Sequence, residues 1–305
     1  MQAMQMERIN VVTPQVVSVW ARRLVLGPWR FIRRWPVIPA IVLGTLIVAG
    51  TFAPWIVPHN PYSGRVRDAF IPPMWAEGGS AKHILGTDHA GRDIMSRIIQ
   101  GGRISLLVVA VSVSVGFVAG STLGLMAAYG GGLWDEAIMR LVDIFYAIPY
   151  MMIALVVVVI FGQSMTIILV LLGLFSWVGF VRVVRAHTLS VKSMDFISLA
   201  RIAGASHLRI IVQHIAPMVL SSAVVVATLS VGNLILLEAT LSFIGAGIPA
   251  PNPAWGTMIA EGRNYISTFW WQAFFPGAAI FLVVMSLNFL GDWLRDRLDP
   301  RLRQI

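Results

Sequence analysis

The sequence predicts an all-α membrane protein with six transmembrane helices. Hydrophobic residues make up 57% of the chain and charged residues 12%, about half of the roughly 25% that is usual in soluble domains. Several windows are apolar over about 20 residues, the length that a helix needs to cross a bilayer. Because such spans pack into one bundle, the length of 305 residues does not indicate separate soluble domains.

The six expected spans follow from these apolar windows. They cover residues 37–57, 104–128, 138–161, 165–185, 217–243 and 273–294. Only Gly162, Gln163 and Ser164 separate the third span from the fourth, which predicts a tight helical hairpin. Pro149 interrupts the third span and predicts a bend there, either a moving hinge or a fixed packing kink.

The distribution of basic residues predicts the orientation. With the N-terminus in the cytoplasm, 16 of the 23 lysines and arginines fall in cytoplasmic segments and 7 outside, as the positive-inside bias requires. Both termini are therefore expected in the cytoplasm. The net charge of +9 does not indicate nucleic-acid binding, since the basic residues cluster at the ends of apolar spans, where arginine meets lipid phosphates.

These assignments divide the chain into regions. They are a cytoplasmic basic and aromatic segment (1–36), an uncleaved membrane anchor (37–57), an extracytoplasmic loop (58–103), a five-helix core (104–294) with a cytoplasmic insert (186–216), and a cytoplasmic tail (295–305). The first segment suits the lipid headgroup region or a partly disordered tail equally well. The chain has no cysteine, so disulfides play no part.

The polar insert between the fourth and fifth spans is the most informative segment. An apolar stripe at helical spacing runs along it, formed by Phe196, Leu199, Ala200 and Ala203. Gly204 then permits a sharp turn, and Ser206 is placed to cap a second short helix. Such a helix suits a groove on a soluble partner. The same stripe would also suit the membrane surface or the chain's own core.

The chain lacks the motifs of an enzyme. It contains no GxxxxGK[ST] phosphate loop, no nucleophile elbow and no HExxH pair, and its lysines are only Lys82 and Lys192. We therefore expect no catalytic residue and no cofactor in this chain. Any energy from ATP must come through another subunit.

The insert resembles the cytoplasmic coupling loop of bacterial ABC importer permeases, whose pattern is EAA, three residues and glycine. Here the pattern reads Ser198-Leu199-Ala200, then three residues and Gly204, so Ser198 replaces the family's glutamate and any salt bridge from it. The resemblance implies an ATPase-coupling surface formed by Asp195, Phe196, Ser198, Leu199, Ala200, Arg201, Ala203, Gly204, Ala205 and Ser206.

Three longer stretches resemble one branch of that family, the second permease of peptide- and nickel-type importers. They run from His83 to Leu106, from Leu237 to Arg263 and from Leu287 to Arg303. The extracytoplasmic signature in the first stretch comprises Gly86, Thr87, Asp88, Gly91, Arg92, Asp93, Arg97 and Arg103. Asp88, Arg92 and Asp93 are expected to bridge charges and pin the loop. The alternative is a solvated loop with surface ion pairs worth about 0–1 kcal/mol each.

A second set of residues is a candidate pathway or gate. It comprises Pro149, Ser230, Asn233 and Glu238. Glu238 stands out because an ionisable residue inside a span is a functional candidate by default, although its position near the outer end of the fifth span favours an interhelical hydrogen bond or an interface role over a pathway or gate role. No metal site is expected, since His83 and His89 lie six residues apart in a loop and no cysteine supports them.

The resemblance implies a type I permease fold in the bacterial inner membrane. It implies one half of a translocation pathway for peptides or a related small solute, such as glutathione, nickel chelates or opines. The implied partners are a homologous second permease, an extracytoplasmic solute-binding protein and two ATP-binding subunits that hold ATP and Mg²⁺. An ion-gradient-driven secondary transporter and a non-transport membrane scaffold are the alternatives.

Overall fold

The computed structural model describes residues 36–298, and the regular elements of that part of the chain are all helical. The expected segment 1–36, except its last residue, and residues 299–305 of the expected tail lie outside the described residues. The chain divides into two units, Met1–Ile38 and Pro39–Ile305. The second unit holds the helices of the described residues, apart from the first residues of α2.

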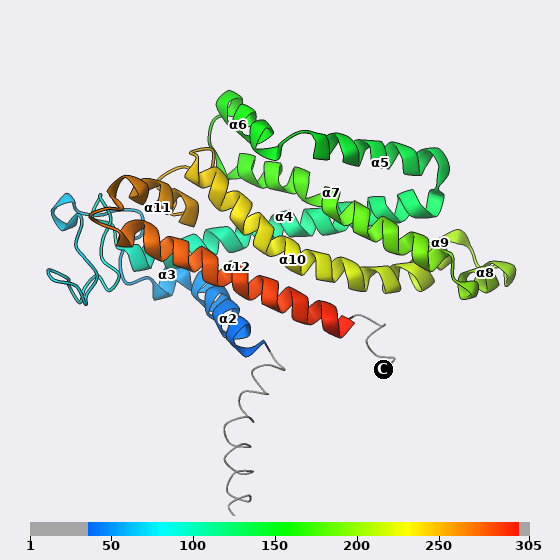
Figure 1. Cartoon of the computed structure of the whole chain (residues 1–305), viewed down its shortest axis with the longest axis horizontal. Helices are drawn as coiled ribbons and strands as arrows, with labels where there is room; N and C mark the ends of the chain where they lie inside the picture. The colour runs from blue at the N-terminus through cyan, green and yellow to red at the C-terminus, as the bar shows by residue number, and fades with distance from the viewer. Residues whose placement is uncertain (1–35, 299–305) are drawn as a thin grey trace, which may run out of the picture. The chain divides into compact units, whose positions relative to one another are not determined.

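Four helices in the described residues are long and apolar enough to cross a membrane. Three are α4 (Ile94–Gly130), α7 (Met165–Lys192) and α12 (Trp271–Leu298). The fourth runs continuously from His207 to Phe243 and ends in α10 (Ala216–Phe243). The helix α4 packs along α7, and α10 contacts α4, α7 and α12, so these four form the core of the unit (Figure 1).

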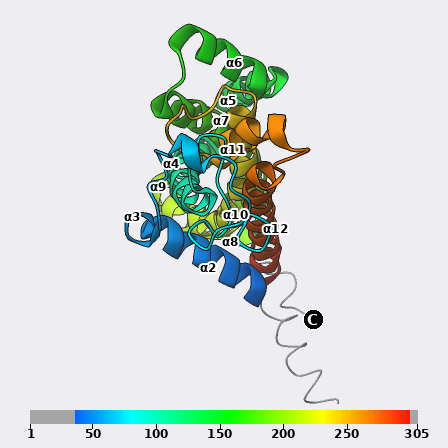
Figure 2. The same cartoon turned by 90° about the vertical axis from the view of Figure 1, so that its left-hand side faces the viewer.

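The predicted third span is a broken one. Helices α5 (Gly132–Ala147) and α6 (Tyr150–Phe161) meet at an angle of 76°, and they count as a fifth span only if taken together. Figure 2 shows the two helices running in different directions. Pro149 is the N-cap of α6, and its missing N–H cannot continue the preceding helix. The predicted bend at Pro149 is therefore confirmed, as is the short turn before α7.

The predicted first span, 37–57, is also divided. An apolar helix, α2 (Val37–Thr51), is followed by the short α3 (Ala53–Ile56), with Phe52 between them. Pro54 lies in the first turn of α3 and lacks the N–H that would extend α2. At 15 residues α2 is shorter than the other spans, so the described residues hold four or five spans of full length.

Three predicted helix ends were wrong. Residues 94–103, expected in a loop, form the start of α4, whose N-cap Asp93 accepts a hydrogen bond from Ser96 N at 2.8 Å. The insert expected at 186–216 is shorter, since α7 continues to Lys192 and helix resumes at His207. Hydropathy marks only the apolar stretch of a helix, whereas its hydrogen bonds continue through polar residues until a cap or glycine ends them.

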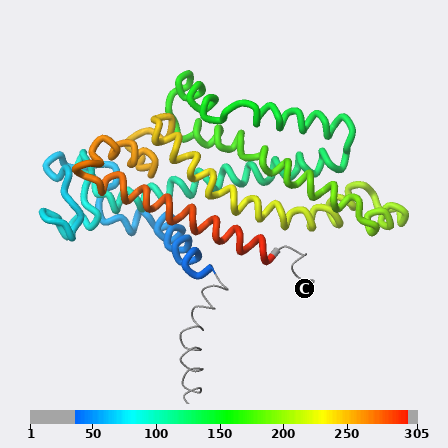
Figure 3. The backbone as a smooth tube through the Cα atoms, viewed as in Figure 1, coloured from blue at the N-terminus to red at the C-terminus, as the bar shows by residue number. Residues whose placement is uncertain are grey.

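The remaining elements are short. They are η1 (Val66–Asp68), α8 (Asp195–Ile202), α9 (His207–Arg209), the π-helical stretch η2 (Ile210–Ile215), α11 (Trp255–Gly262) and η3 (Arg263–Tyr265). The stretch η2 runs into α10 without a loop (Figure 3). Helix α11 packs on α10 and α12.

Glycines allow α4 and α7 to approach closely. Gly116, Gly120 and Gly124 recur every four residues on α4 and face α7. A Cβ atom on Gly120 would lie 2.5 Å from Trp177 O and from Phe180 Cβ. Small residues at this spacing let the backbones of membrane helices approach closely. Such close packing drives helix association in lipid, where no hydrophobic force brings helices together.

The substitution Gly120→Leu is expected to destabilise the protein by about 1–3 kcal/mol or more, because the added atoms overpack the α4–α7 interface. The measurement is the thermal unfolding midpoint of the protein purified in detergent. Gly44→Leu in α2 is the matched control, since nothing lies within 4 Å of a Cβ atom there. Equal midpoints for the two variants would contradict the prediction.

Candidate functional site: the insert and the signature loop

The insert, defined here as residues 193–209, has the predicted form of two short helices joined at Gly204. Gly204 adopts φ = +82°, the left-handed conformation that favours glycine. Ala205 N donates to Ala200 O at 3.0 Å and closes the end of α8. The side chain of Ser206 caps α9 by accepting a hydrogen bond from Arg209 N at 3.4 Å. Local rules thus account for this segment.

The insert has an anchored face and an exposed face. Ile197 of α8 is buried together with Ile210 and Ile215 of η2, against Val184 and Val191 of α7. The opposite face exposes three large apolar side chains: Leu199 (65% exposed), Ile202 (84%) and Leu208 (71%). The insert is therefore anchored to α7 and η2, and it exposes large apolar side chains on the side away from these helices.

The residues predicted for coupling lie on the exposed face. Asp195, Phe196, Ser198, Leu199, Arg201, Ala203, Gly204 and Ser206 are exposed, and Ala200 and Ala205 are half-buried. The predicted stripe therefore does not pack into the chain's own core. Sequence reasoning overlooked Ile197, the residue that anchors α8, and Ile202, the most exposed apolar residue of the insert.

Polar contacts fasten both ends of the insert to the end of α4. Lys192, just before the insert, donates from Nζ to Ala128 O (3.0 Å) and Tyr129 O (2.8 Å). These carbonyls belong to the last turn of α4, where the helix supplies no partner and a cation is favoured. At the other end, Tyr129 Oη and His207 Nδ1 are hydrogen-bonded at 2.7 Å. Sequence reasoning missed these contacts, which join distant residues.

The signature loop, defined here as residues 83–97, contains a buried ionic cluster of Asp88, Arg92 and Arg97 with Glu261 of α11. Arg92 donates from Nε to Asp88 Oδ2 (2.7 Å) and from Nη2 to Glu261 Oε2 (2.9 Å). Arg97 donates from Nη1 to Asp88 Oδ2 and to Glu261 Oε2, the latter at 2.8 Å. The side chains of Asp88 and Arg97 are 4% and 2% exposed, so this is no solvated loop with surface ion pairs.

The predicted bridge between Asp88 and Arg92 is present, but Asp93 takes no part in the cluster. Asp93 caps α4 and is hydrogen-bonded to His83 Nδ1 at 2.9 Å. Arg103 is exposed and lies further along α4. Sequence reasoning missed Glu261, although it falls within a stretch already singled out. Its proximity to Arg97, 164 residues away, is visible only in the fold.

Backbone geometry explains the glycines of the loop. Gly86 and Gly91 adopt φ = +83° and +73°, and a Cβ atom on Gly91 would lie 1.9 Å from Arg65 O. The buried Thr87 carbonyl accepts a hydrogen bond from Trp271 Nε1 of α12 at 3.1 Å. The loop is thus pinned against α11 and α12 at the start of α4.

The candidate pathway residues do not form one site. Glu238 is buried, and Ser242 Oγ of its own helix donates to its Oε1 at 2.7 Å. This bond lies within α10, not between helices. Asn233 is exposed and Ser230 half-buried on α10, while Pro149 lies at the α5–α6 bend. No hydrogen bond among the described residues joins these four positions.

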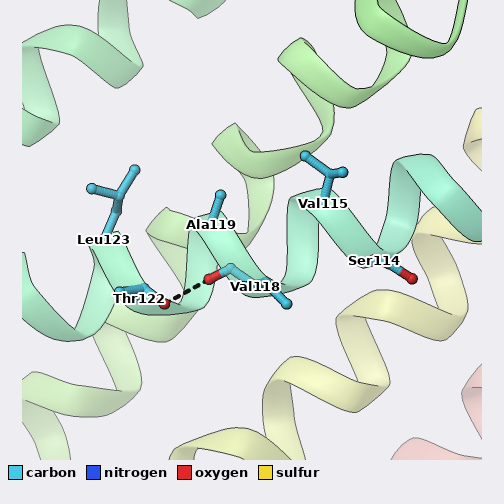
Figure 4. A pocket seen from close by; sticks show the side chains of 6 residues that line it. All are labelled: Ser114, Val115, Val118, Ala119, Thr122 and Leu123. Atoms are coloured by element: carbon cyan, nitrogen blue, oxygen red, sulfur yellow. Dashed lines mark hydrogen bonds between the residues drawn. The ribbon is translucent and has the colours of Figure 1, made fainter.

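A shallow groove runs along α4. It is lined by Ser114, Val115, Val118, Ala119, Thr122 and Leu123 (Figure 4). Thr122 Oγ1 donates to Val118 O at 2.7 Å, so its hydroxyl is satisfied within the helix. A solute site normally combines apolar walls with several convergent polar groups. Ser114 and Thr122 are the polar residues of this groove, and its lining is otherwise apolar, which suits contact with another apolar surface.

The comparisons with known proteins decide the family. Residues 120–304 match the family model described as "Binding-protein-dependent transport system inner membrane component". The chain belongs to this family. It is therefore a multi-pass permease subunit of an ABC importer in the inner membrane, and subunits of this family are not themselves catalytic. The expected all-α permease fold, the function and the location are confirmed, whereas the six spans and the cytoplasmic termini stay predictions.

Curated relatives cover most of the permease. The di/tripeptide transport system permease protein DppC of Pseudomonas aeruginosa is 39% identical over 259 residues, which is 85% of each chain. The dipeptide permease DppC of Escherichia coli is 41% identical over 279 residues, 90% of this chain and 93% of the relative. The nickel permease NikC of the same organism is 36% identical over 270 residues, 88% and 95%.

A solved structure supports the fold. An inward-facing conformation of the MetNI methionine ABC transporter matches with a TM-score of 0.56 and 21% identity, covering 68% of this permease and 98% of that chain. The helical fold of this chain is therefore similar to that of the matched transporter chain.

Proposed function

We propose that this permease imports peptides or closely related small solutes and that two ATP-binding subunits drive it through the insert. ATP and Mg²⁺ are bound by those subunits. A homologous second permease completes the pathway, and a solute-binding protein delivers the solute outside the membrane. In this arrangement the insert and both termini face the cytoplasm and the signature loop faces outward.

The single observation that carries the proposal is the exposed apolar face of the anchored insert. Leu199, Ile202 and Leu208 project from a segment that also exposes the charged residues Asp195, Arg201 and Arg209. Burying one large aliphatic side chain contributes about 1.5–3 kcal/mol, so a soluble partner that covers this face gains substantial affinity. A few fully desolvated apolar anchors commonly dominate an interface.

The anchoring of the insert supports its role in force transmission. Lys192 fastens one end of the insert to α4, and the bond between His207 and Tyr129 fastens the other. When the ATP-binding partner closes on binding ATP, it would therefore move α4, α7 and α10 together with the insert. A flexible loop would instead deform without moving these helices. Alternating access by rocking of these helices is the proposed mechanism, with hydrolysis resetting them.

The need for a second permease is supported by the groove on α4. The described residues offer there an open apolar surface without charged groups. An apolar helix of a homologous subunit would complete a passage that one chain leaves open. Peptides are the proposed solute class because the dipeptide permeases match over up to 90% of this chain. Glutathione and nickel are the alternative solutes, because permeases for them are also similar to this chain.

The test is purification of the tagged permease from its host in a mild detergent, followed by mass spectrometry. We expect a second permease and one or two ATP-binding subunits to accompany it. The purified assembly is reconstituted in liposomes together with its binding protein. It should transport a labelled dipeptide only when ATP is present on the side of the membrane that the ATP-binding subunits face. Recovery of the chain alone, with uptake driven by an ion gradient, would overturn the proposal.

A further inference from the structure

Two histidines and an aspartate gather beside the start of α4. His59 follows α3, His83 lies in the signature loop, and Asp93 is the N-cap of α4. Their ligand atoms all lie within 4.8 Å of one another. Asp93 Oδ1 is 2.9 Å from His83 Nδ1 and 3.9 Å from His59 Nδ1, and the two imidazole rings are 4.6 Å apart between centroids.

The Asp93 carboxylate is held in place by its surroundings. Asp93 Oδ2 accepts hydrogen bonds from Ser96 N at 2.8 Å and from Ser96 Oγ at 2.6 Å, so Oδ1 is the oxygen left to face the histidines. The backbone N of His59 in turn donates to Ser96 Oγ at 3.1 Å. The Asp93 side chain is 2% exposed, so its charge is withdrawn from solvent.

The hydrogen bonding of this cluster is incomplete. His59 Nδ1 is buried and has no hydrogen-bond partner among the described residues. A buried polar atom without a partner is costly, and each such atom in a native structure calls for an explanation. One carboxylate oxygen faces two ring nitrogens, and only that of His83 is within hydrogen-bonding distance.

We propose that His59, His83 and Asp93 bind a divalent transition-metal ion. Two imidazole nitrogens and one carboxylate oxygen form a donor set that suits Zn²⁺ and its first-row neighbours. In a tetrahedral zinc site, bonds of about 2.0–2.1 Å place neighbouring donor atoms about 3.4 Å apart. The separations of 2.9 and 3.9 Å bracket this value. The bound ion links His59, which follows α3, and His83 of the signature loop to Asp93 at the N-terminus of α4.

A neighbouring cluster provides the contrast. Asp88, His89 and Glu261 also bring their ligand atoms within 4.8 Å, but Asp88 Oδ2 and Glu261 Oε2 both accept from Arg92 and Arg97. Two guanidinium groups already neutralise that site and repel a cation. The sequence-based expectation of no metal considered His83 with His89, whereas the fold pairs His83 with His59.

The experiment uses Zn²⁺ as the probe and the full-length permease, purified with its accompanying subunits on a tag free of histidine. Bound zinc is counted by elemental analysis after desalting, and Co²⁺ is added separately to observe visible d–d absorption. Wild type and His89→Ala should retain one more equivalent of zinc per permease than His59→Gln or His83→Asn. The intense absorption of four-coordinate cobalt should be lost in the same two variants.

His59→Gln is the decisive variant, because His59 Nδ1 has no hydrogen-bond partner among the described residues that its replacement would lose. Its thermal unfolding midpoint without metal should equal that of wild type, and only wild type should gain stability on adding Zn²⁺. Equal zinc content and equal cobalt spectra in wild type and His59→Gln would overturn the proposal and leave a hydrogen bond between His83 and Asp93 as the cluster's whole role.

Discussion

Replacing Ile202 by aspartate is expected to lower ATP-dependent uptake at least tenfold while leaving the permease folded in the membrane. Ile202 is 84% exposed, so the substitution disturbs no packing within the described residues. In the proposed assembly the same side chain is buried against an ATP-binding subunit. Loss of its burial costs about 1.5–3 kcal/mol, and an unpaired carboxylate at the interface adds more. Each 1.4 kcal/mol lowers affinity about tenfold.

The readouts for Ile202→Asp are the amount of ATP-binding subunit that co-purifies and the rate of solute uptake in liposomes. Both should fall at least tenfold, with an unchanged thermal midpoint of the permease. Val66→Asp is the matched control, because Val66 is 85% exposed in η1, beside the signature loop. If both variants retain the ATP-binding subunits equally, the exposed face of the insert is not the docking surface.

Replacing Arg97 by methionine is expected to cause the largest loss of stability of any single change in the signature loop. Arg97 is buried and shares Asp88 and Glu261 with Arg92. Removing it leaves two carboxylates facing one guanidinium, and breaking a buried ionic arrangement in this way costs about 3–5 kcal/mol. The thermal midpoint should fall by several degrees or more, at roughly 2–4 °C per kcal/mol for domains of 150–250 residues.

A double-mutant cycle makes the Arg97 experiment specific. Glu261→Gln combined with Arg97→Met removes one charge of each sign, so the double variant should be less destabilised than the two single effects added together. Arg103→Ala is the control, since Arg103 is exposed and lies outside the cluster. A midpoint for Arg97→Met equal to that of Arg103→Ala would show that the cluster contributes little.

The parts of the fold that depend on local chemistry were predictable from the sequence. The two helices of the insert, the turn at Gly204 and the cap at Ser206 follow from side-chain spacing and backbone preferences within a few residues. The bend at Pro149 follows from a missing N–H. The bridge between Asp88 and Arg92 spans four residues, which one turn of chain brings together.

The parts of the fold and of the site that depend on residues distant in the sequence could not be predicted from it. Glu261 joins the ionic cluster from 169 residues beyond Arg92, and no local rule selects it from the other acidic residues. Lys192 reaches α4 carbonyls more than 60 residues earlier. Helix ends beyond the apolar windows were misplaced because hydropathy measures contact with lipid, not backbone hydrogen bonding. The glycines of α4 recur every four residues in the sequence, but the sequence does not show that α7 is the helix against which they pack.

The direct passage from the insert through η2 into α10 has a practical consequence for spectroscopy. Only Ser193 and Met194 separate α7 from α8, and no loop separates α9 from α10, so a probe on the insert moves with the helices that carry it. The chain contains no cysteine, and a single one introduced at the exposed Ser193 or Ser198 is therefore the sole thiol available for labelling. With a second cysteine in place of the exposed Val66, the distance between the two labels would follow the transport cycle in an otherwise native sequence.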